Sequence, residues 1–138
     1  MRVYDLIAEW YASERDDQTG VPEVTALASS ISRRALLLDV GSGNGIPIAR
    51  ALLSEGHRVV GLDSSNAMLA RYKQNCPEAF AVRGIVESCP FADGVFDAAV
   101  AWGVMFHLNR EDAIPAIANI SHILKRGAPL ADLCQRAP

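Results

Sequence analysis

The sequence lacks the charge pattern of a protein that binds nucleic acid. It has 13 basic and 16 acidic residues, for a formal net charge of −3. The basic residues are scattered, and the only adjacent pairs are Arg33–Arg34 and Lys125–Arg126. Proteins that track phosphates cluster their cations along one face. We therefore expect no nucleic-acid partner for this chain.

Long apolar runs are also missing. The uncharged stretch 98–109 is far shorter than the roughly 20 residues that a membrane helix needs. Arg2 and Asp5 interrupt the N-terminus, where a secretory signal would have a continuous apolar region. These two absences predict a cytoplasmic protein without a membrane partner.

Cysteine is sparse as well. Cys76, Cys89 and Cys134 form neither a CxxC spacing nor an even set that could pair completely. Structural zinc sites and disulfide frameworks require such patterns. We expect reduced thiols and no metal site.

What is present is the composition of a globular protein with a hydrophobic core, because half of the residues are apolar and 21% are charged. The length of 138 residues suits one domain. We expect a single domain in three parts, with N-terminal helices over 1–32, a core of strands and helices over 35–127, and a short tail over 128–138.

Two helices are predicted before the core. Apolar residues recur at helical spacing over 2–15, and a second apolar stripe runs over 22–32. Pro22 suits the first turn of the second helix, where a backbone N–H is not needed. Tyr4, Trp10 and Tyr11 place aromatic side chains on the first helix.

Beyond residue 34, strands alternate with helices. Short, continuously apolar runs are typical of strands buried on both faces. Alternating strands and helices form right-handed crossovers, and hence an α/β fold with a doubly wound, mostly parallel sheet. The predicted strands are 35–40, 58–63, 80–84 and 96–102, with a short fifth at 128–133, and the predicted helices are 46–55, 65–74 and 109–126.

Three details of this pattern concern single residues. Ser64 is expected to be the N-cap of helix 65–74. His57 and His122 are expected at a strand edge and on a helix surface. The apolar face of helix 109–126 is predicted to consist of Ile114, Ile117, Ile120, Ile123 and Leu124.

A glycine-rich turn, Asp39-Val40-Gly41-Ser42-Gly43-Asn44-Gly45, connects the first predicted strand to the next helix. Glycines let the backbone turn sharply and let a ligand approach the main chain, and the helix that follows presents free N–H groups. The turn therefore predicts a site for a nucleotide-like ligand. The alternative is a tight turn without a ligand.

Asp63 ends the second predicted strand, 18 residues after Gly45. Nucleotide-binding folds place a ribose-binding acid roughly 20 residues after their glycines. A carboxylate can accept hydrogen bonds from both hydroxyls of a ribose. Asp63 is therefore predicted to bind a ribose, the alternative being a carboxylate that only caps the following helix.

The dinucleotide fingerprint is absent. The patterns GxGxxG and GxGxxA require glycine or alanine at position 46 or 48, where this chain has Ile46 and Ile48. A nucleotide-dependent oxidoreductase is therefore disfavoured.

An acid followed by three alternating glycines resembles the class I S-adenosylmethionine-dependent methyltransferase family, and the resemblance extends over about residues 4–127. It implies a Rossmann-like methyltransferase fold, S-adenosylmethionine as the cofactor and S-adenosylhomocysteine as its product. The reaction would be an in-line displacement that the protein assists by alignment and exclusion of water. Four further stretches are similar to that family: Val-Val-Gly-Leu-Asp at 59–63, Cys-Pro-Phe at 89–91, Asp-Gly-Val-Phe-Asp at 93–97 and Ile-Leu-Lys-Arg-Gly at 123–127.

The resemblance also implies roles for individual residues. Asp39 would position the ammonium group of the cofactor, or alternatively pin the amides of its own turn. Asp63, with Ser64 beside it, would hold the ribose. Tyr11 would close over the sulfonium, or alternatively belong to the ordinary core. The loop beside the methionine part would consist of Gly41, Ser42, Gly43, Asn44 and Gly45.

The adenine contact departs from the family pattern. The family often has Gly-Asp after the third strand, whereas here Gly84 is followed by Ile85. Val86 and Glu87 lie in the same segment, so an apolar face with a backbone contact or a Glu87 contact can replace the missing acid. The alternative is that Glu87 is simply solvated.

The methyl acceptor is expected to be a small molecule. The Asn/Asp-Pro-Pro-aromatic motif of amino-directed enzymes and the Pro-Cys motif of cytosine-directed enzymes are both absent from 101–108, the segment after the fourth strand. His107 lies in that segment, and a neutral imidazole there could remove a proton from the acceptor. The alternative is a histidine that only hydrogen-bonds the backbone at the start of a helix.

The C-terminus is expected to be truncated relative to the family, whose seven-stranded sheet ends in a strand hairpin. The tail 128–138 has room for one short strand and matches that hairpin poorly. An exposed sheet edge would remain, through which two copies could pair. Two functions are therefore expected as alternatives: a small-molecule methyltransferase, or a cofactor-binding remnant without turnover.

Overall fold

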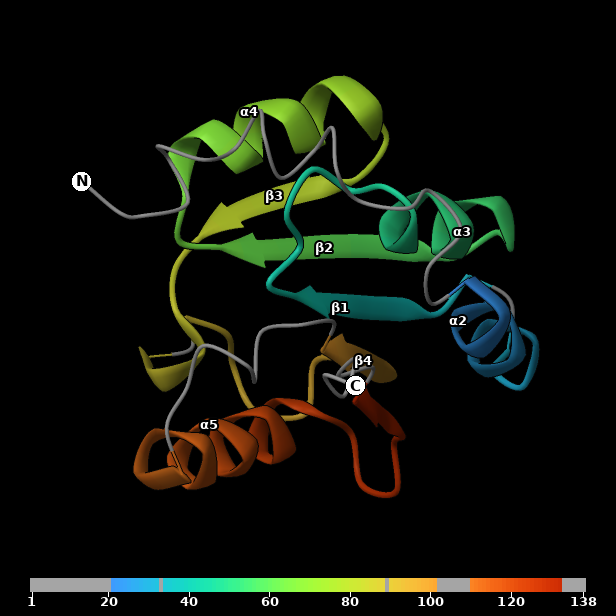
Figure 1. The fold of residues 1–138 in the computed structure, drawn as a ribbon. Helices are drawn as coiled ribbons and strands as arrows, with labels where there is room; N and C mark the ends of the chain where they lie inside the picture. The colour runs from blue at the N-terminus through green and yellow to red at the C-terminus, as the bar shows by residue number, and fades with distance from the viewer. Residues whose placement is uncertain (1–20, 33, 89, 102–109, 133–138) are drawn as a thin grey trace, which may run out of the picture.

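The computed structural model describes residues 21–32, 34–88, 90–101 and 110–132 (Figure 1). The predicted helix 2–15 lies outside these described residues, and so do two of the candidate site residues, Tyr11 and His107.

The described residues form one five-stranded sheet, in the order β3-β2-β1-β4-β5. All four strand pairs are parallel. The predicted doubly wound parallel sheet is therefore confirmed. The strands are β1 (Leu36–Val40), β2 (Arg58–Asp63), β3 (Phe80–Arg83), β4 (Ala98–Ala101) and β5 (Leu130–Asp132).

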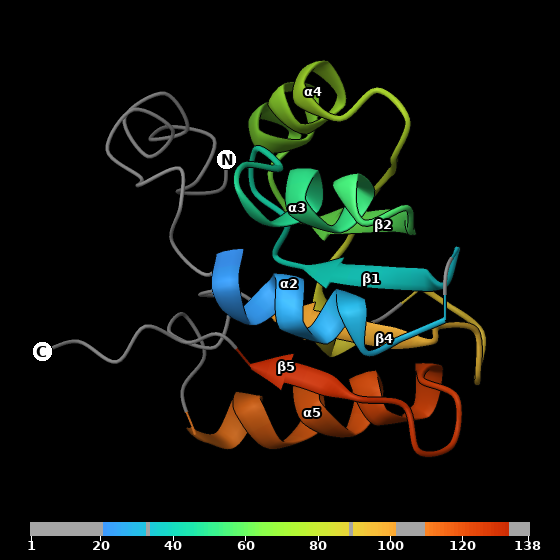
Figure 2. The ribbon, with the colours of Figure 1, turned by 90° about the vertical axis from the view of Figure 1, so that its right-hand side faces the viewer.

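Helices cover both faces of this sheet (Figures 1 and 2). The apolar side chains of α2, α3 and α4 pack on one face, and those of α5 pack on the other. None of the helices in the described ranges has both the length and the apolar character needed to cross a lipid bilayer. The helices are α2 (Val21–Ser29), α3 (Ile48–Ser54), α4 (Asn66–Asn75) and α5 (Arg110–Ile123), with a short 3₁₀ helix η1 (Val86–Ser88).

Each strand of the sheet centre contributes to two separate cores, because successive side chains point to opposite faces. Leu37 and Val59 lie in the core beneath α2, α3 and α4, whereas Leu38 and Val60 lie in the core beneath α5. Burial on both faces explains why these strands are continuously apolar in sequence.

The N-cap of α4 differs from the prediction. Ser65, with φ −94° and ψ 118°, is the N-cap, and its Oγ accepts a hydrogen bond from the Met68 N–H at 3.2 Å. Ser64 is therefore not the cap, because the helix begins at Asn66 and the capping residue directly precedes the first helical one.

The buried face of α5 also differs from the prediction. Ile114 and Ile117 are 65% and 45% exposed, so their assignment to the core-facing side was wrong. Among the α5 residues whose burial is described, the buried ones are Ala116, whose small side chain sits against the sheet core, Ile120 and Ile123. Ile114 and Ile117 have a helical spacing of their own, so the sequence period could not distinguish the two faces.

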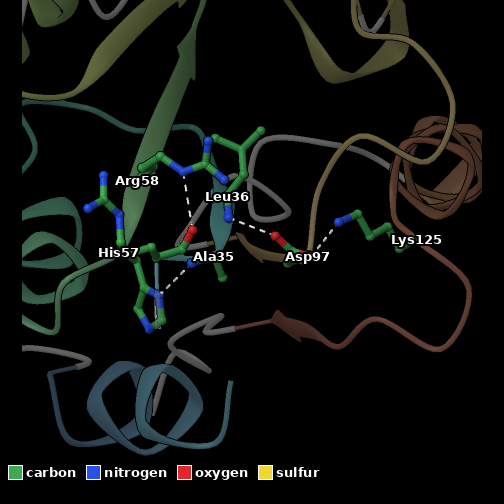
Figure 3. Close-up of polar contacts among 7 residues, drawn as sticks. Ala35, Leu36, His57, Arg58, Asp97 and Lys125 are labelled. Atoms are coloured by element: carbon green, nitrogen blue, oxygen red, sulfur yellow. Dashed lines mark hydrogen bonds and ion pairs between the residues drawn. The ribbon is translucent and has the colours of Figure 1, made fainter. Parts of the chain in front are cut away.

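His57 joins α2 to the start of the sheet. Its Nδ1 accepts a hydrogen bond from the Ala35 N–H at 3.2 Å (Figure 3). Because Nδ1 accepts, Nε2 carries the ring proton and donates it to the Ala28 carbonyl oxygen, 2.8 Å away. His57 does precede β2, as expected for a residue at a strand edge, but its side chain is buried and bridges two backbone groups.

We expect His57→Ala to lower the free energy of unfolding by about 2–3 kcal/mol, since it leaves two buried backbone groups without their partner. Urea denaturation measures the change. His122→Ala is the matched control, because His122 is exposed on α5 and its removal should have almost no effect. Equal losses in the two variants would contradict the bridging role of His57.

Asp97 ties the start of β1 to the segment after α5. Its Oδ2 accepts the Leu36 N–H at 2.8 Å, and its Oδ1 lies 2.7 Å from Lys125 Nζ (Figure 3). The hydrogen bond from Lys125, followed by the one from Leu36, lowers the pKa of the Asp97 carboxyl. This aspartate belongs to the 93–97 stretch, so the stretch has a clear structural role.

A lowered pKa in the folded state means that ionised Asp97 stabilises the fold above the unfolded-state pKa of about 3.9, and that this contribution is lost as the pH falls below it. Because the ion pair is partly exposed, we expect Asp97→Asn to cost only about 1 kcal/mol at pH 7. The difference from the unmutated chain should shrink towards pH 2.5. Urea midpoints at both pH values test this, with Asp93→Asn as the exposed control, and a pH-independent difference would contradict it.

Candidate functional site

The loop between β1 and α3 has three residues in the left-handed region of the backbone map. Gly41, Gly43 and Gly45 have φ values of 68°, 56° and 84°. Residues with a Cβ rarely adopt these angles, so glycine is required at all three positions. The alternation of glycines in sequence therefore corresponds to an alternation of backbone conformation, which folds the loop back over the end of β1.

The end of β2 anchors the start of this loop. The N–H groups of Gly41 and Ser42 both donate to the Leu62 carbonyl oxygen, at 2.8 and 3.0 Å. The Gly45 N–H then donates back to the Ser42 carbonyl oxygen at 3.2 Å, which closes a tight turn. These hydrogen bonds hold the loop against the end of β2.

The far side of the loop is anchored by α4. Asn44 Oδ1 accepts the Ile46 N–H at 3.0 Å, and the Asn44 carbonyl oxygen accepts a hydrogen bond from Asn75 Nδ2 at 2.9 Å. Cys76 Sγ lies 3.8 Å from the Gly45 carbonyl oxygen. Burial raises the pKa of the Cys76 thiol to about 11, which keeps it protonated at neutral pH.

Asp63 connects the loop to the start of α4. Its Oδ2 accepts the Gly43 N–H at 2.9 Å, and its Oδ1 accepts the Ser65 N–H at 2.9 Å. A carboxylate has about four lone-pair sites, so it can accept several hydrogen bonds at once. Asp63 therefore does serve the start of α4, which was the alternative to ribose binding. The two hydrogen bonds also hold its half-buried carboxylate at the carboxyl end of β2.

Asp39 occupies the corresponding end of β1 and is only 1% exposed. It lies opposite Gly61 of β2 and Val100 of β4 in the parallel register. The order β3-β2-β1-β4-β5 changes direction between β1 and β4. Ligands of open α/β sheets bind at the carboxyl ends of strands beside such a switch point.

Tyr72 is a site residue that the sequence analysis did not identify. It projects from α4 and is completely buried. A Cβ added to Gly61 would lie 2.6 Å from Tyr72 Cζ, and one added to Gly45 would lie 3.1 Å from Tyr72 Cδ2. The ring therefore fills a space that two glycines leave open. Its position four residues after Met68 and four before Cys76 is the signal that would have placed it on the buried side of α4.

The other predicted site residues lie in the glycine loop, after β2 and in η1. Ser42 and Asn44 are buried within the loop, and Ser64 is half-buried next to Asp63. Glu87 lies in η1, whose Val86 carbonyl oxygen accepts a hydrogen bond from Asn119 Nδ2 at 3.0 Å. Val86 itself is buried in the core beneath α5.

A family model described as a methyltransferase domain matches residues 37–127. The chain is 29% identical over 127 residues to a tRNA (carboxymethyluridine(34)-5-O)-methyltransferase of Xenopus tropicalis, covering 91% of this chain and 19% of that protein. It is 30% identical over 128 residues to a demethylmenaquinone methyltransferase of Beutenbergia cavernae, covering 93% and 50%.

Among solved structures, a TehB-like SAM-dependent methyltransferase from Corynebacterium glutamicum is similar to this chain with a TM-score of 0.70 and 31% identity, over 88% of this chain and 65% of that one. The chain spans about a fifth to a half of the length of the curated relatives that it matches.

Proposed function

Because the chain belongs to the family of methyltransferase domains, we propose that it binds S-adenosylmethionine at the loop after β1 and transfers the methyl group to a small-molecule acceptor. The observation that carries the proposal is the carboxylate of Asp63, which two backbone amides hold beside three left-handed glycines.

The residues of the site fit this cofactor. The glycine loop presents main chain without Cβ atoms, as close approach of a ligand requires. Asp63 is oriented by its hydrogen bonds from Gly43 and Ser65, and a carboxylate can accept hydrogen bonds from a ribose diol. When bound, S-adenosylmethionine supplies a methyl group that its sulfonium has already activated.

The chain's own residues would bind the cofactor and orient it. Asp63, with Ser64 next to it, would accept hydrogen bonds from the ribose hydroxyls. Asp39, buried at the end of β1, would attract the ammonium group of the cofactor. Glu87 of η1 would lie towards the adenine, and Tyr11 would cover the sulfonium. The loop against the methionine part would consist of Gly41, Ser42, Gly43, Asn44 and Gly45.

A small-molecule acceptor is supported by the scattered basic residues, because binding of nucleic acid requires clustered cations. The similar proteins include a demethylmenaquinone methyltransferase and a tRNA methyltransferase, so relatives of both kinds exist. His107 is proposed as the group that takes a proton from the acceptor.

Isothermal calorimetry of the purified chain with S-adenosylmethionine and S-adenosylhomocysteine tests the cofactor site, and we expect micromolar dissociation constants for both. Methyl transfer is then assayed with a panel of quinols and phenols and, in parallel, with bulk tRNA. Methylation of tRNA alone would overturn the small-molecule acceptor. Binding without any turnover would favour the alternative of a cofactor-binding remnant, and the absence of binding by folded protein would refute the whole proposal.

We also propose that two copies associate through β5, which has a strand neighbour only on its β4 side within the described residues. The open side of such an edge presents unpaired N–H and C=O groups that can pair with a second chain. Light scattering over a range of concentrations should show a mass that rises to that of a dimer. A monomeric mass at the highest concentration would contradict this association.

A further inference from the structure

The phenol of Tyr72 lies directly beside Asp39, although the two residues are far apart in sequence. Asp39 and Gly61 are register partners in the parallel pair of β1 and β2. The side chains of such partners point to the same face of the sheet. Because a Cβ on Gly61 would lie 2.6 Å from Tyr72 Cζ and 2.9 Å from its hydroxyl oxygen, the phenol end occupies the place next to the Asp39 side chain.

The hydroxyl of Tyr72 has no hydrogen-bond partner within the described part of the chain, although the side chain is completely buried. A buried hydroxyl without a partner is unfavourable, whereas phenylalanine would fill the same space without that cost. The Oγ of Ser42 in the adjoining loop is likewise buried and without a partner among the described residues. Two such buried hydroxyls, one in the loop and one beneath it, indicate a polar environment that is completed by further groups.

The charge state of the phenol is set by its surroundings. Burial, and next the negative charge of Asp39, raise the pKa of Tyr72 far above its ordinary value. Tyr72 therefore keeps its O–H proton at neutral pH. A neutral O–H beside a carboxylate can only be a favourable donor, either directly or through one water molecule.

We propose that Tyr72 is a positioning residue of the cofactor site. Its ring supports the glycine loop from beneath Gly45, and its hydroxyl, through one shared buried water, orients the Asp39 carboxylate towards the ammonium group of the cofactor. This inference rests on the proposed function, and it adds a residue of α4 to a site otherwise made by the ends of β1 and β2.

Tyr72→Phe tests the hydroxyl alone, because the ring and its packing are kept. Calorimetry compares S-adenosylmethionine with 5′-methylthioadenosine, which has the adenosine part and lacks the amino-acid part. We expect the variant to bind S-adenosylmethionine about tenfold more weakly, equivalent to the loss of one hydrogen bond to a charged group. Its affinity for 5′-methylthioadenosine should stay within about twofold of the unmutated chain, and its thermal midpoint should be unchanged.

A purely structural role for the hydroxyl predicts other results. Unchanged affinity for both ligands, or an equal loss for both, would overturn the inference while leaving the proposed function intact. If the unmutated chain bound neither ligand, the proposed function and this inference would fail together. A crystal structure of the unmutated chain gives an independent test, because a water at about 2.7–3.0 Å from both Tyr72 Oη and an Asp39 oxygen is expected. Its absence would also overturn the inference.

Discussion

Replacing Asp63 by alanine is expected to weaken binding of S-adenosylmethionine by at least about 100-fold, because each hydrogen bond between the carboxylate and a ribose hydroxyl contributes about 1.5–3 kcal/mol. The same substitution removes the acceptor for the Gly43 and Ser65 amides, which hold the loop against α4. Calorimetry measures the affinity, and circular dichroism establishes that the variant is folded at the temperature used.

Two further variants test whether the loss of affinity is specific to the Asp63 carboxylate. Asp63→Asn keeps one acceptor oxygen and loses the charge, so its affinity should fall between those of Asp63→Ala and the unmutated chain. Glu55→Ala removes an exposed carboxylate at the end of α3 and should bind S-adenosylmethionine normally. If Asp63→Ala retained the affinity of the unmutated chain, the ribose would have to bind elsewhere.

Replacing Gly61 by alanine is expected to lower the free energy of unfolding by about 2–3 kcal/mol, near the upper end of the cost of overpacking a core. The added Cβ would lie 2.6 Å from Tyr72 Cζ, and the Tyr72 side chain is completely buried. Urea denaturation at neutral pH measures the loss.

A second substitution tests whether the Tyr72 ring causes this loss of stability. Tyr72→Leu removes the ring end that the new methyl group meets, so Gly61→Ala should cost much less in a Tyr72→Leu background. Gly84→Ala is the matched control, since its Cβ would lie 3.0 Å from the movable end of Leu62. Equal costs of Gly61→Ala in both backgrounds would show that the ring is not the obstacle.

Most of the candidate site could be read from local sequence, because its central residues follow one another along the chain. Glycines at alternate positions need no tertiary information to be recognised, and Asp63 ends a strand at a characteristic distance from them. The hydrogen bonds of Asp63 could not be predicted in the same way. They depend on how far the loop folds back over β2, which the contact of Gly41 with Leu62 determines.

Sequence patterns could not identify the residues of α4 that support the loop. Tyr72 belongs to the site because α4 packs over β2, and Asn75 because the last turn of α4 reaches Asn44. In sequence, both are ordinary residues of an amphipathic helix. Only the packing of that helix gives them their contacts.

The sequence by itself determined the order and type of the strands β1 to β5 and of the helices α2 to α5, since the periods of strands and helices are local properties of the chain. It also determined where the backbone must be left-handed, as at Gly43. The tertiary structure decided which side of an element is buried, as the exposed Ile114 and the buried His57 illustrate. It also decided which distant groups meet, as Asp97 does with Leu36. These outcomes depend on contacts between segments far apart in the chain, and no local period contains that information.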